Sequence, residues 1–207
     1  MTSNLLWKPN QDQIDHRNLT AFAKQHGFAP DDYPALHQWS ITSRDSFWSS
    51  VWSFCDIVGD PGSDVLINPD SFPGSRWFPE ASLNFSENLL RYDDARTALV
   101  AITEQGERVT MTYAELRVEV AKFAAELEER GVEPGDRVAG WMPNVIETVI
   151  AMLGTTAIGA VWSSCSPDFG VEGALDRFGQ IKPKVLVACD GYSYNGKTYD
   201  ITGNVDN

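Results

Sequence analysis

Hydrophobic positions in the first part of the chain follow a helical period. Leu19, Phe22 and Ala23 recur at i, i+3 and i+4, which is typical of one buried helix face. Gly27 is a natural stop for that helix. Residues 29–34 contain two prolines beside paired aspartates, so we expect a turn there. The pattern predicts a short amphipathic helix followed by a turn.

A second helix is predicted to begin at Thr42 or Ser43. Thr42 and Asp45 have the spacing of a capping box in which Asp replaces the usual Glu. The apolar positions that follow lie at i, i+4, i+7, i+8 and i+11, and are Phe47, Val51, Phe54, Cys55 and Val58. Gly59 ends this pattern. We interpret the stripe as core packing rather than a cofactor site, because it forms one continuous apolar face.

Proline interrupts regular structure after this helix. Four prolines fall within residues 60–79, which makes helices and strands unfavourable there. Phe72, Trp77 and Phe78 favour burial, so we expect a rigid wrapping segment. The predicted organisation is a helical N-terminal cap at 1–59, a Pro-rich linker at 60–97 and a main domain at 98–207.

From residue 98 onward, strand and helix patterns alternate. Residues 98–103 and 108–112 flank the polar segment Glu104-Gln-Gly-Glu107, which predicts a β-hairpin. Thr112 and Glu115 form a capping box that opens a helix ending at Gly131. The remaining predicted elements are a strand at 137–142, a helix capped by Asn144, a strand at 160–163, a helix with Val171, Leu175 and Phe178 facing inward, and a strand at 185–188. This order indicates an α/β domain with a parallel sheet and crossover helices.

Residues 189–207 are polar and rich in turn formers, so no further strand is expected there. A sheet of so few strands would leave an unpaired edge and an exposed apolar face. We therefore expect an incomplete domain that lacks a C-terminal remainder.

Charge and cysteine content limit the partners of this protein. Lysine and arginine number 16 against 29 acidic residues, and the net charge of −13 argues against nucleic acid or an anionic membrane as the main partner. The apolar run 145–162 carries only Glu147 and is broken by Thr and Gly, so a buried helix leading into a buried strand is expected rather than a membrane span. Cys55, Cys165 and Cys189 form no disulfide or metal-ligand motif, which favours a reducing, cytoplasmic location.

Motifs for nucleotide or nucleophile chemistry are weak. Gly154-Thr-Thr156 lies inside an apolar helical run, so it is not expected to cradle phosphate. Cys165 has no histidine in the second half of the chain to activate it, and we expect a buried, inert thiol. Between residues 177 and 199, four basic residues occur in the sequence against a single acidic one, Asp190. They could bind a phosphate-bearing ligand or act only as solubilising charges, and they are Arg177, Lys182, Lys184 and Lys197.

Three groups of residues resemble the acyl-CoA synthetases of the adenylate-forming superfamily. Arg44-Asp-Ser-Phe-Trp48 and Val51-Trp-Ser-Phe54 resemble the N-terminal cap of its acetyl-CoA synthetase branch. Residues 76–90, Arg76-Trp-Phe-Pro-Glu-Ala-Ser-Leu-Asn-Phe-Ser-Glu-Asn-Leu-Leu90, are most similar to the acetoacetate–CoA ligases of that branch. The third group is general to the superfamily and comprises residues 112–116, 135–138, 142–144, 159–161 and Ser166-Pro.

The resemblance implies a fold and a reaction. The fold would be the incomplete first subdomain of the adenylate-forming fold, with a parallel sheet and crossover helices, preceded by a helical cap. In the complete enzyme, ATP and acetoacetate would form an acyl-adenylate with loss of pyrophosphate, and the thiol of CoA would displace AMP. Magnesium and a catalytic Lys would serve the first step. The superfamily's phosphate loop and that Lys do not occur in this sequence, so we expect the chain alone to be inactive, with no catalytic residue or metal ligand of its own.

The resemblance also implies one ligand contact. In related acetyl-CoA synthetases, a basic pair in a stretch after a strand-ending Asp contacts the nucleotide part of CoA. Asp190-Gly-Tyr-Ser-Tyr-Asn-Gly-Lys197 occupies that place. Lys197 matches the second basic position, and Tyr194 replaces the first. Lys197 and Tyr194 are therefore the candidate CoA-binding residues.

Other functions fit the same sequence. The chain could be a non-catalytic binding or assembly module, one half of a split acyl-CoA ligase, or a free-standing CoA-binding domain. The acid could also be acetate or propionate instead of acetoacetate, because no pocket residue identifies it.

Overall fold

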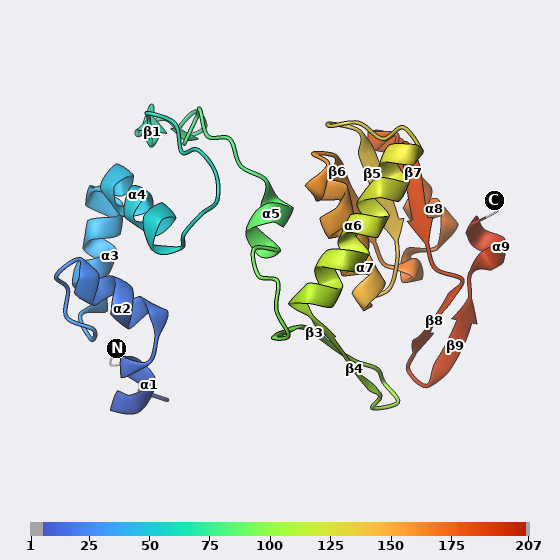
Figure 1. Ribbon diagram of the computed structural model, residues 1–207, viewed down its shortest axis with the longest axis horizontal. Helices are drawn as coiled ribbons and strands as arrows, with labels where there is room; N and C mark the ends of the chain where they lie inside the picture. The colour runs from blue at the N-terminus through green and yellow to red at the C-terminus, as the bar shows by residue number, and fades with distance from the viewer. Residues whose placement is uncertain (1–5, 206–207) are drawn as a thin grey trace. The chain divides into compact units, whose positions relative to one another are not determined.

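The computed structural model describes residues 6–205 of the chain (Figure 1). The chain divides into two units, one up to Ser82 and one from Leu83 onward. Each unit has a hydrophobic core of its own.

The first unit is built from short helices around an aromatic core. Its elements are α1 (Gln11–Asp15), α2 (Asn18–Gln25), α3 (Tyr33–Thr42), α4 (Arg44–Phe54) and the antiparallel pair β1 (Leu66–Ile67) and β2 (Arg76–Trp77). Phe22 of α2 is 5% exposed, and its ring lies 5.7 Å from that of Phe47 and 5.1 Å from that of Phe54. These edge-to-face contacts confirm core packing for Phe47, Val51 and Phe54 of the predicted stripe. Cys55 and Val58 follow the end of α4 and are exposed.

Several predictions for the first unit need correction. Phe72, which was expected to favour burial, is 100% exposed, and the strands β1 and β2 form inside the Pro-rich segment. The expected turn at 29–34 is present at Pro30 and Asp31, but it is shorter than predicted. Helix α3, which was not predicted, begins at Tyr33, because Asp32 accepts a hydrogen bond from the Ala35 amide and Pro34 is tolerated in the first helical turn. Thr42 was expected to cap α4, but its hydroxyl donates to the Gln38 carbonyl within α3. The next helix, α4, ends at Phe54, before Gly59.

The second unit contains the strands and helices that build the predicted α/β domain. Its elements are α5 (Phe85–Leu89), β3 (Thr97–Ile102), β4 (Arg108–Thr112), α6 (Tyr113–Glu129), β5 (Arg137–Trp141), α7 (Ile146–Ala157), β6 (Val161–Cys165), the 3-10 turn η1 (Pro167–Phe169), α8 (Gly170–Ile181), β7 (Val185–Ala188), β8 (Gly191–Tyr194), β9 (Lys197–Asp200) and α9 (Thr202–Val205). The predicted capping box opens α6: the Thr112 amide donates to the Glu115 carboxylate and the Glu115 amide to the Thr112 hydroxyl.

The parallel sheet has the strand order β6-β5-β7, which confirms the predicted α/β class. Side chains alternate along β5: Ala139 and Trp141 pack against α8, whereas Val138 packs in the core that α6 lines on the other face. Figure 1 shows α6 and α7 beside each other over the sheet. The central strand β5 is therefore covered on both faces.

The outer strands are less buried than expected. Val161 of β6 is 49% exposed and Leu186 of β7 is 45% exposed, because each strand has a neighbour on one side within the described residues. Residues 145–162 form α7 and lead into β6, as expected, although the strand is not fully buried. Within residues 6–205, no helix has both the length and the apolar character needed to cross a membrane.

Three further predictions for this unit need correction. The N-cap of α7 is Val145 rather than Asn144, and it makes no side-chain cap hydrogen bond. Leu175 of α8 does not face inward: it is 63% exposed, whereas Phe178 is buried. The polar segment after residue 188 is not irregular, because β8 and β9 form an antiparallel hairpin there.

Candidate functional site at the carboxyl ends of the parallel strands

The carboxyl ends of the three parallel strands lie at one edge of the sheet. Trp141 pairs with Cys165 on one side and with Ala188 on the other, so β5, β6 and β7 end level with one another. In open α/β sheets, ligands bind outside this edge, where the loops after the strands meet. The segments that follow the strands here are 142–145, 166–169 and 189–190.

The segment after β6 is a fixed turn. The indole Nε1 of Trp141 donates to the Ser166 carbonyl at 3.2 Å, and the Ser166 hydroxyl donates to the Asp168 carboxylate at 3.2 Å. Asp168 also accepts a hydrogen bond from the Tyr192 hydroxyl, and this bond is the main cause that raises the pKa of Tyr192 to about 12. These contacts connect the turn after β6 to the first strand of the β8–β9 hairpin.

The two thiols at this edge are poor nucleophiles. Cys165, the last residue of β6, is 8% exposed, and burial raises the pKa of its thiol. Burial also raises the pKa of the Cys189 thiol, which follows β7. A raised pKa lowers the thiolate fraction at neutral pH. The prediction that Cys165 is a buried thiol near a strand end is confirmed.

The β8–β9 hairpin presents both candidate CoA-binding residues. Tyr194 and Lys197 are cross-strand partners that flank the two-residue turn Asn195-Gly196. Both turn residues have positive φ values, 51° and 71°, as a type I′ hairpin turn requires. Directly opposed residues project from the same face of a two-stranded ribbon. Tyr194 and Lys197 therefore lie together, and both are exposed.

The other basic residues of this part of the chain do not join Lys197. Lys182 and Lys184 precede β7 and so lie at the opposite end of the sheet from the segment that leads to Lys197. The Lys184 ammonium lies 2.9 Å from the Asp136 carboxylate and holds the pKa of that carboxyl below its usual value. The Arg177 guanidinium lies 4.2 Å above the Phe169 ring. Of the four cations, Lys197 alone is carried by the hairpin.

The described residues do not hold phosphate or metal in the way the reaction's first step would need. Gly154-Thr-Thr156 lies in the last turn of α7, where the backbone amides are used within the helix and no helix N-terminus is available to an anion. Between residues 6 and 205, no group of three or more His, Cys, Asp or Glu side chains could hold a metal ion. Magnesium bound to nucleotide phosphates needs only one or two carboxylates, so this result identifies no magnesium ligand, and we assign no step through magnesium to these residues.

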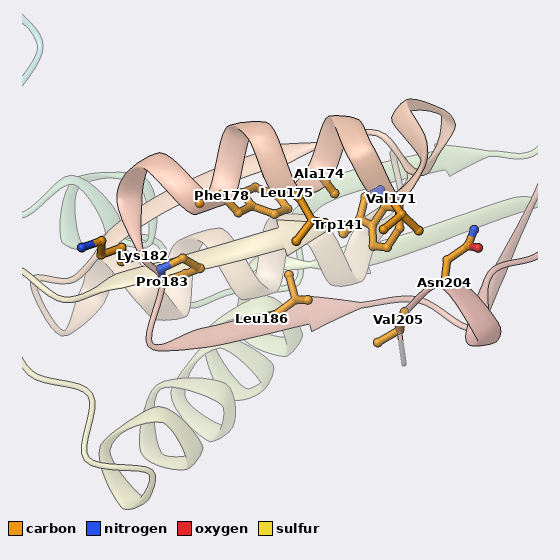
Figure 2. Close-up of a pocket in the computed structure, with 11 residues that line it drawn as sticks. Trp141, Val171, Ala174, Leu175, Phe178, Lys182, Pro183, Leu186, Asn204 and Val205 are labelled. Carbon is orange, nitrogen blue, oxygen red and sulfur yellow. The ribbon is translucent and has the colours of Figure 1, made fainter. Parts of the chain in front are cut away.

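An apolar groove of about 310 Å³ lies between α8 and β7 (Figure 2). Figure 2 shows Leu175 and Leu186 projecting toward each other across it, with Val205 of α9 below. Lys182 is the one charged residue among those that line it. This lining suits hydrophobic side chains rather than a nucleotide.

Two sequence families match the chain. The family described as "AMP-binding enzyme" matches residues 85–204, and the one described as "Acetyl-coenzyme A synthetase N-terminus" matches residues 33–89. The solved structure of an acetoacetyl-CoA synthetase from Streptomyces lividans superposes with a TM-score of 0.89 at 42% identity, covering 97% of this chain and 32% of that one.

Curated relatives agree with these matches. An acetoacetyl-coenzyme A synthetase from Rhizobium meliloti is 43% identical over 97% of this chain, and one from Danio rerio is 40% identical over the same share. A malonamoyl-CoA synthetase from Penicillium aethiopicum is 36% identical over 86% of it. The chain spans 31% of the length of the first two relatives. With its parallel sheet and the family match over residues 85–204, the chain belongs to the AMP-binding enzyme family.

Proposed function

We propose that this chain contributes to an acid–thiol ligase that activates acetoacetate with ATP and transfers the acyl group to CoA. The observation that carries the proposal is the similarity to acetoacetyl-CoA synthetases along 97% of the chain, in sequence and in fold. In this reaction the carboxylate displaces pyrophosphate from ATP and forms an acyl-adenylate. The CoA thiolate then attacks the acyl carbon, and AMP leaves.

The β8–β9 hairpin is the part of this chain that we assign to CoA. The Lys197 ammonium supplies a positive charge for a CoA phosphate, and the exposed ring of Tyr194 beside it supplies a flat surface for a base or ribose. Within residues 6–205, Lys197 forms no ion pair, so its charge is available to a ligand. A single exposed cation of this kind contributes modestly to affinity.

The chain by itself is expected to be inactive. It contains no Ser/Thr/Gly-rich loop ending in Pro-Lys, the segment that holds the ATP phosphates in the enzymes it resembles. We expect no acetoacetate-dependent exchange of labelled pyrophosphate into ATP by the 207-residue polypeptide. Measurable exchange would contradict this assignment.

The ligase activity can be tested in a chimera. Residues 1–205 replace the matching third of the solved acetoacetyl-CoA synthetase, and CoA thioester formation is measured with acetoacetate, acetate, propionate and malonamate. We expect acetoacetate to have the highest kcat/KM. A preference for malonamate would favour the second candidate, a ligase for another short acid, which the malonamoyl-CoA synthetase relative supports. A folded chimera inactive with every acid would contradict the proposal.

The CoA assignment has a separate test in the same chimera. Lys197→Ala is expected to raise the KM for CoA about 2- to 5-fold and to leave the KM for ATP unchanged, since it removes one exposed charge pair. Lys122→Ala is the matched control, because Lys122 is also exposed but lies on α6 in an ion pair with Glu119. Equal effects of the two substitutions would mean that Lys197 has no specific role.

We also propose a cytoplasmic location for this ligase. The three cysteines form no disulfide among the residues that the structure describes, which fits a reducing compartment.

A further inference from the structure

Glu104 holds the turn of the β8–β9 hairpin from a distant part of the chain. Its Oε1 accepts a hydrogen bond from the Asn195 amide at 2.9 Å, and its Oε2 accepts one from the Gly196 amide at 3.1 Å. Glu104 belongs to the turn between β3 and β4 and lies 91 residues before Asn195. Figure 1 shows the tips of the two hairpins next to each other.

The turn is suited to an anionic side chain. Asn195 and Gly196 both have positive φ values, and the pairing across the ribbon leaves their amides outside the strand ladder. Successive amides in a turn can converge on one anion. The Glu104 carboxylate accepts one bond with each oxygen, and the two bonds hold the pKa of Glu104 below its usual value. The carboxylate is therefore ionised when it holds the turn at neutral pH.

The held turn determines the place of both candidate CoA-binding residues. Lys197 follows Gly196 directly, and Tyr194 precedes Asn195 directly. A two-stranded ribbon is marginally stable by itself, so an exposed tip without support would sample many positions. At its other end, this hairpin is anchored by the Tyr192–Asp168 hydrogen bond. The Ile201 amide donates to the Asp190 carbonyl there and joins the two strands at their base. Glu104 supplies the anchor at the tip.

We propose that Glu104 is a positioning residue for CoA: it fixes the Asn195-Gly196 turn so that Lys197 is presented to a phosphate of CoA in a preformed arrangement. This inference rests on the proposed CoA role of the hairpin. In this proposal, Glu104 itself does not contact CoA. A preformed site loses less conformational freedom when it binds, so loss of the anchor weakens binding without removing the charge that makes the contact.

The opposite role is also testable. In this second role, the two turn amides form a binding site for a phosphate of the ligand, and the Glu104 carboxylate occupies that site and excludes the phosphate. In that case its removal would tighten CoA binding. The two roles therefore predict effects of opposite sign.

The first measurement is amide hydrogen exchange of the full 207-residue chain. Glu104→Ala is expected to speed exchange at Asn195 and Gly196 about tenfold, the effect of losing a hydrogen bond to a charged acceptor. Glu104→Gln retains one oxygen acceptor and is expected to protect one amide. Glu107→Ala is the matched control at the other end of the same turn and is expected to change neither amide. Unchanged exchange in Glu104→Ala would overturn the proposal.

The second measurement is titration of the same proteins with CoA at low salt, with the melting temperature recorded for each. Weaker binding by about 2- to 5-fold in both Lys197→Ala and Glu104→Ala, with an unchanged melting temperature, supports the proposal. Weaker binding in Lys197→Ala alone, or tighter binding in Glu104→Ala, overturns the positioning role and leaves the CoA site intact. No effect of Lys197→Ala, or no CoA binding by the unaltered chain, means that the proposed CoA site itself is wrong, and the positioning role falls with it.

Discussion

The side-chain amide of Asn84 donates a hydrogen bond to the carbonyl oxygen of Thr156 at 3.0 Å. A second bond from the same nitrogen reaches the Ala157 carbonyl, also at 3.0 Å. These carbonyls belong to the last turn of α7, where no next turn of helix follows. The Gly159 amide also donates to the Thr156 carbonyl. The Oδ1 atom of Asn84 meanwhile accepts a hydrogen bond from the Glu87 amide and caps α5. The Asn84 side chain therefore makes hydrogen bonds both with an amide at the start of α5 and with carbonyls at the end of α7.

Replacing Asn84 is expected to loosen both helix ends. We predict that Asn84→Ala lowers the free energy of unfolding by about 2 kcal/mol, from a lost N-cap and lost bonds to partly buried carbonyls. Urea unfolding measures the change. Asn84→Asp separates the two roles, because it retains the capping oxygen but cannot donate to Thr156 and places a negative charge at the carboxyl end of α7. Wild-type stability of Asn84→Asp would show that the contact with α7 contributes nothing.

Gly154 allows α7 to approach α6 closely. A Cβ atom at this position would lie 3.2 Å from both the Ala124 nitrogen and the Val120 carbonyl oxygen of α6. Helix propensity alone would make Gly154→Ala stabilising by about 1 kcal/mol. We predict the opposite, a destabilisation of about 1–3 kcal/mol, because backbone atoms cannot move aside without separating the helices.

The control for this prediction is Gly179→Ala in α8. Nothing lies within 4 Å of a Cβ atom built at Gly179, so the propensity gain should appear there undiminished. Thermal unfolding of the two variants should move in opposite directions. A stabilised Gly154→Ala variant would contradict the close packing of α6 on α7.

Local signals in the sequence predicted much of this fold. The Thr112–Glu115 capping box defines the start of α6 because both partners lie within one turn. The alternation of strands and helices predicted the parallel sheet, since crossover connections leave few arrangements. The β8–β9 hairpin differs from the prediction, because the polar composition around it is typical of irregular structure even though Asn195-Gly196 is a strong hairpin signal.

Long-range relationships could not be predicted in the same way. Only the resemblance to related synthetases indicates Tyr194 and Lys197 as candidate CoA-binding residues, and only the register of the hairpin shows that they are cross-strand partners. The bond from Glu104 to Asn195 joins residues 91 positions apart, and neither residue carries a pattern that indicates the other. The exposure of Leu175 likewise depends on the groove between α8 and the outer strand β7. Helical periodicity along α8 carries no information about that groove.

Tyr192 gives the hairpin a pH dependence in alkaline solution. Its pKa is raised to about 12 from the ordinary value of 10.0, chiefly by the hydrogen bond to Asp168 and secondly by burial. Because the folded pKa lies above the unfolded one, the contribution to stability is complete below pH 10 and is lost as the pH rises from about 10 to 12.

Absorbance titration of tyrosinate can detect this group. The difference between the wild-type and Tyr192→Phe titrations is expected to show one ionisation near pH 12. In Asp168→Asn, which removes the charge of the acceptor, that ionisation should move toward pH 10. A Tyr192 ionisation that Asp168→Asn does not shift would show that the carboxylate is not its partner.

Thr155 and Thr156 are neighbours in α7 with opposite environments. Thr155 is fully buried, and its hydroxyl has no hydrogen-bond partner among the described residues. The Thr156 hydroxyl donates to the Met152 carbonyl at 2.9 Å and lies 2.7 Å from the Ser86 hydroxyl. We predict that Thr155→Val stabilises the protein by about 1 kcal/mol, since it removes an unpaired polar group without changing side-chain shape. Thr156→Val, the matched control, should destabilise by a similar amount, because it removes one of the two hydrogen-bond contacts of the buried Ser86 hydroxyl, which then keeps only the Leu153 carbonyl. The midpoints of urea unfolding compare the two variants directly. If Thr155→Val loses as much stability as Thr156→Val, the Thr155 hydroxyl has a hydrogen-bond partner in solution.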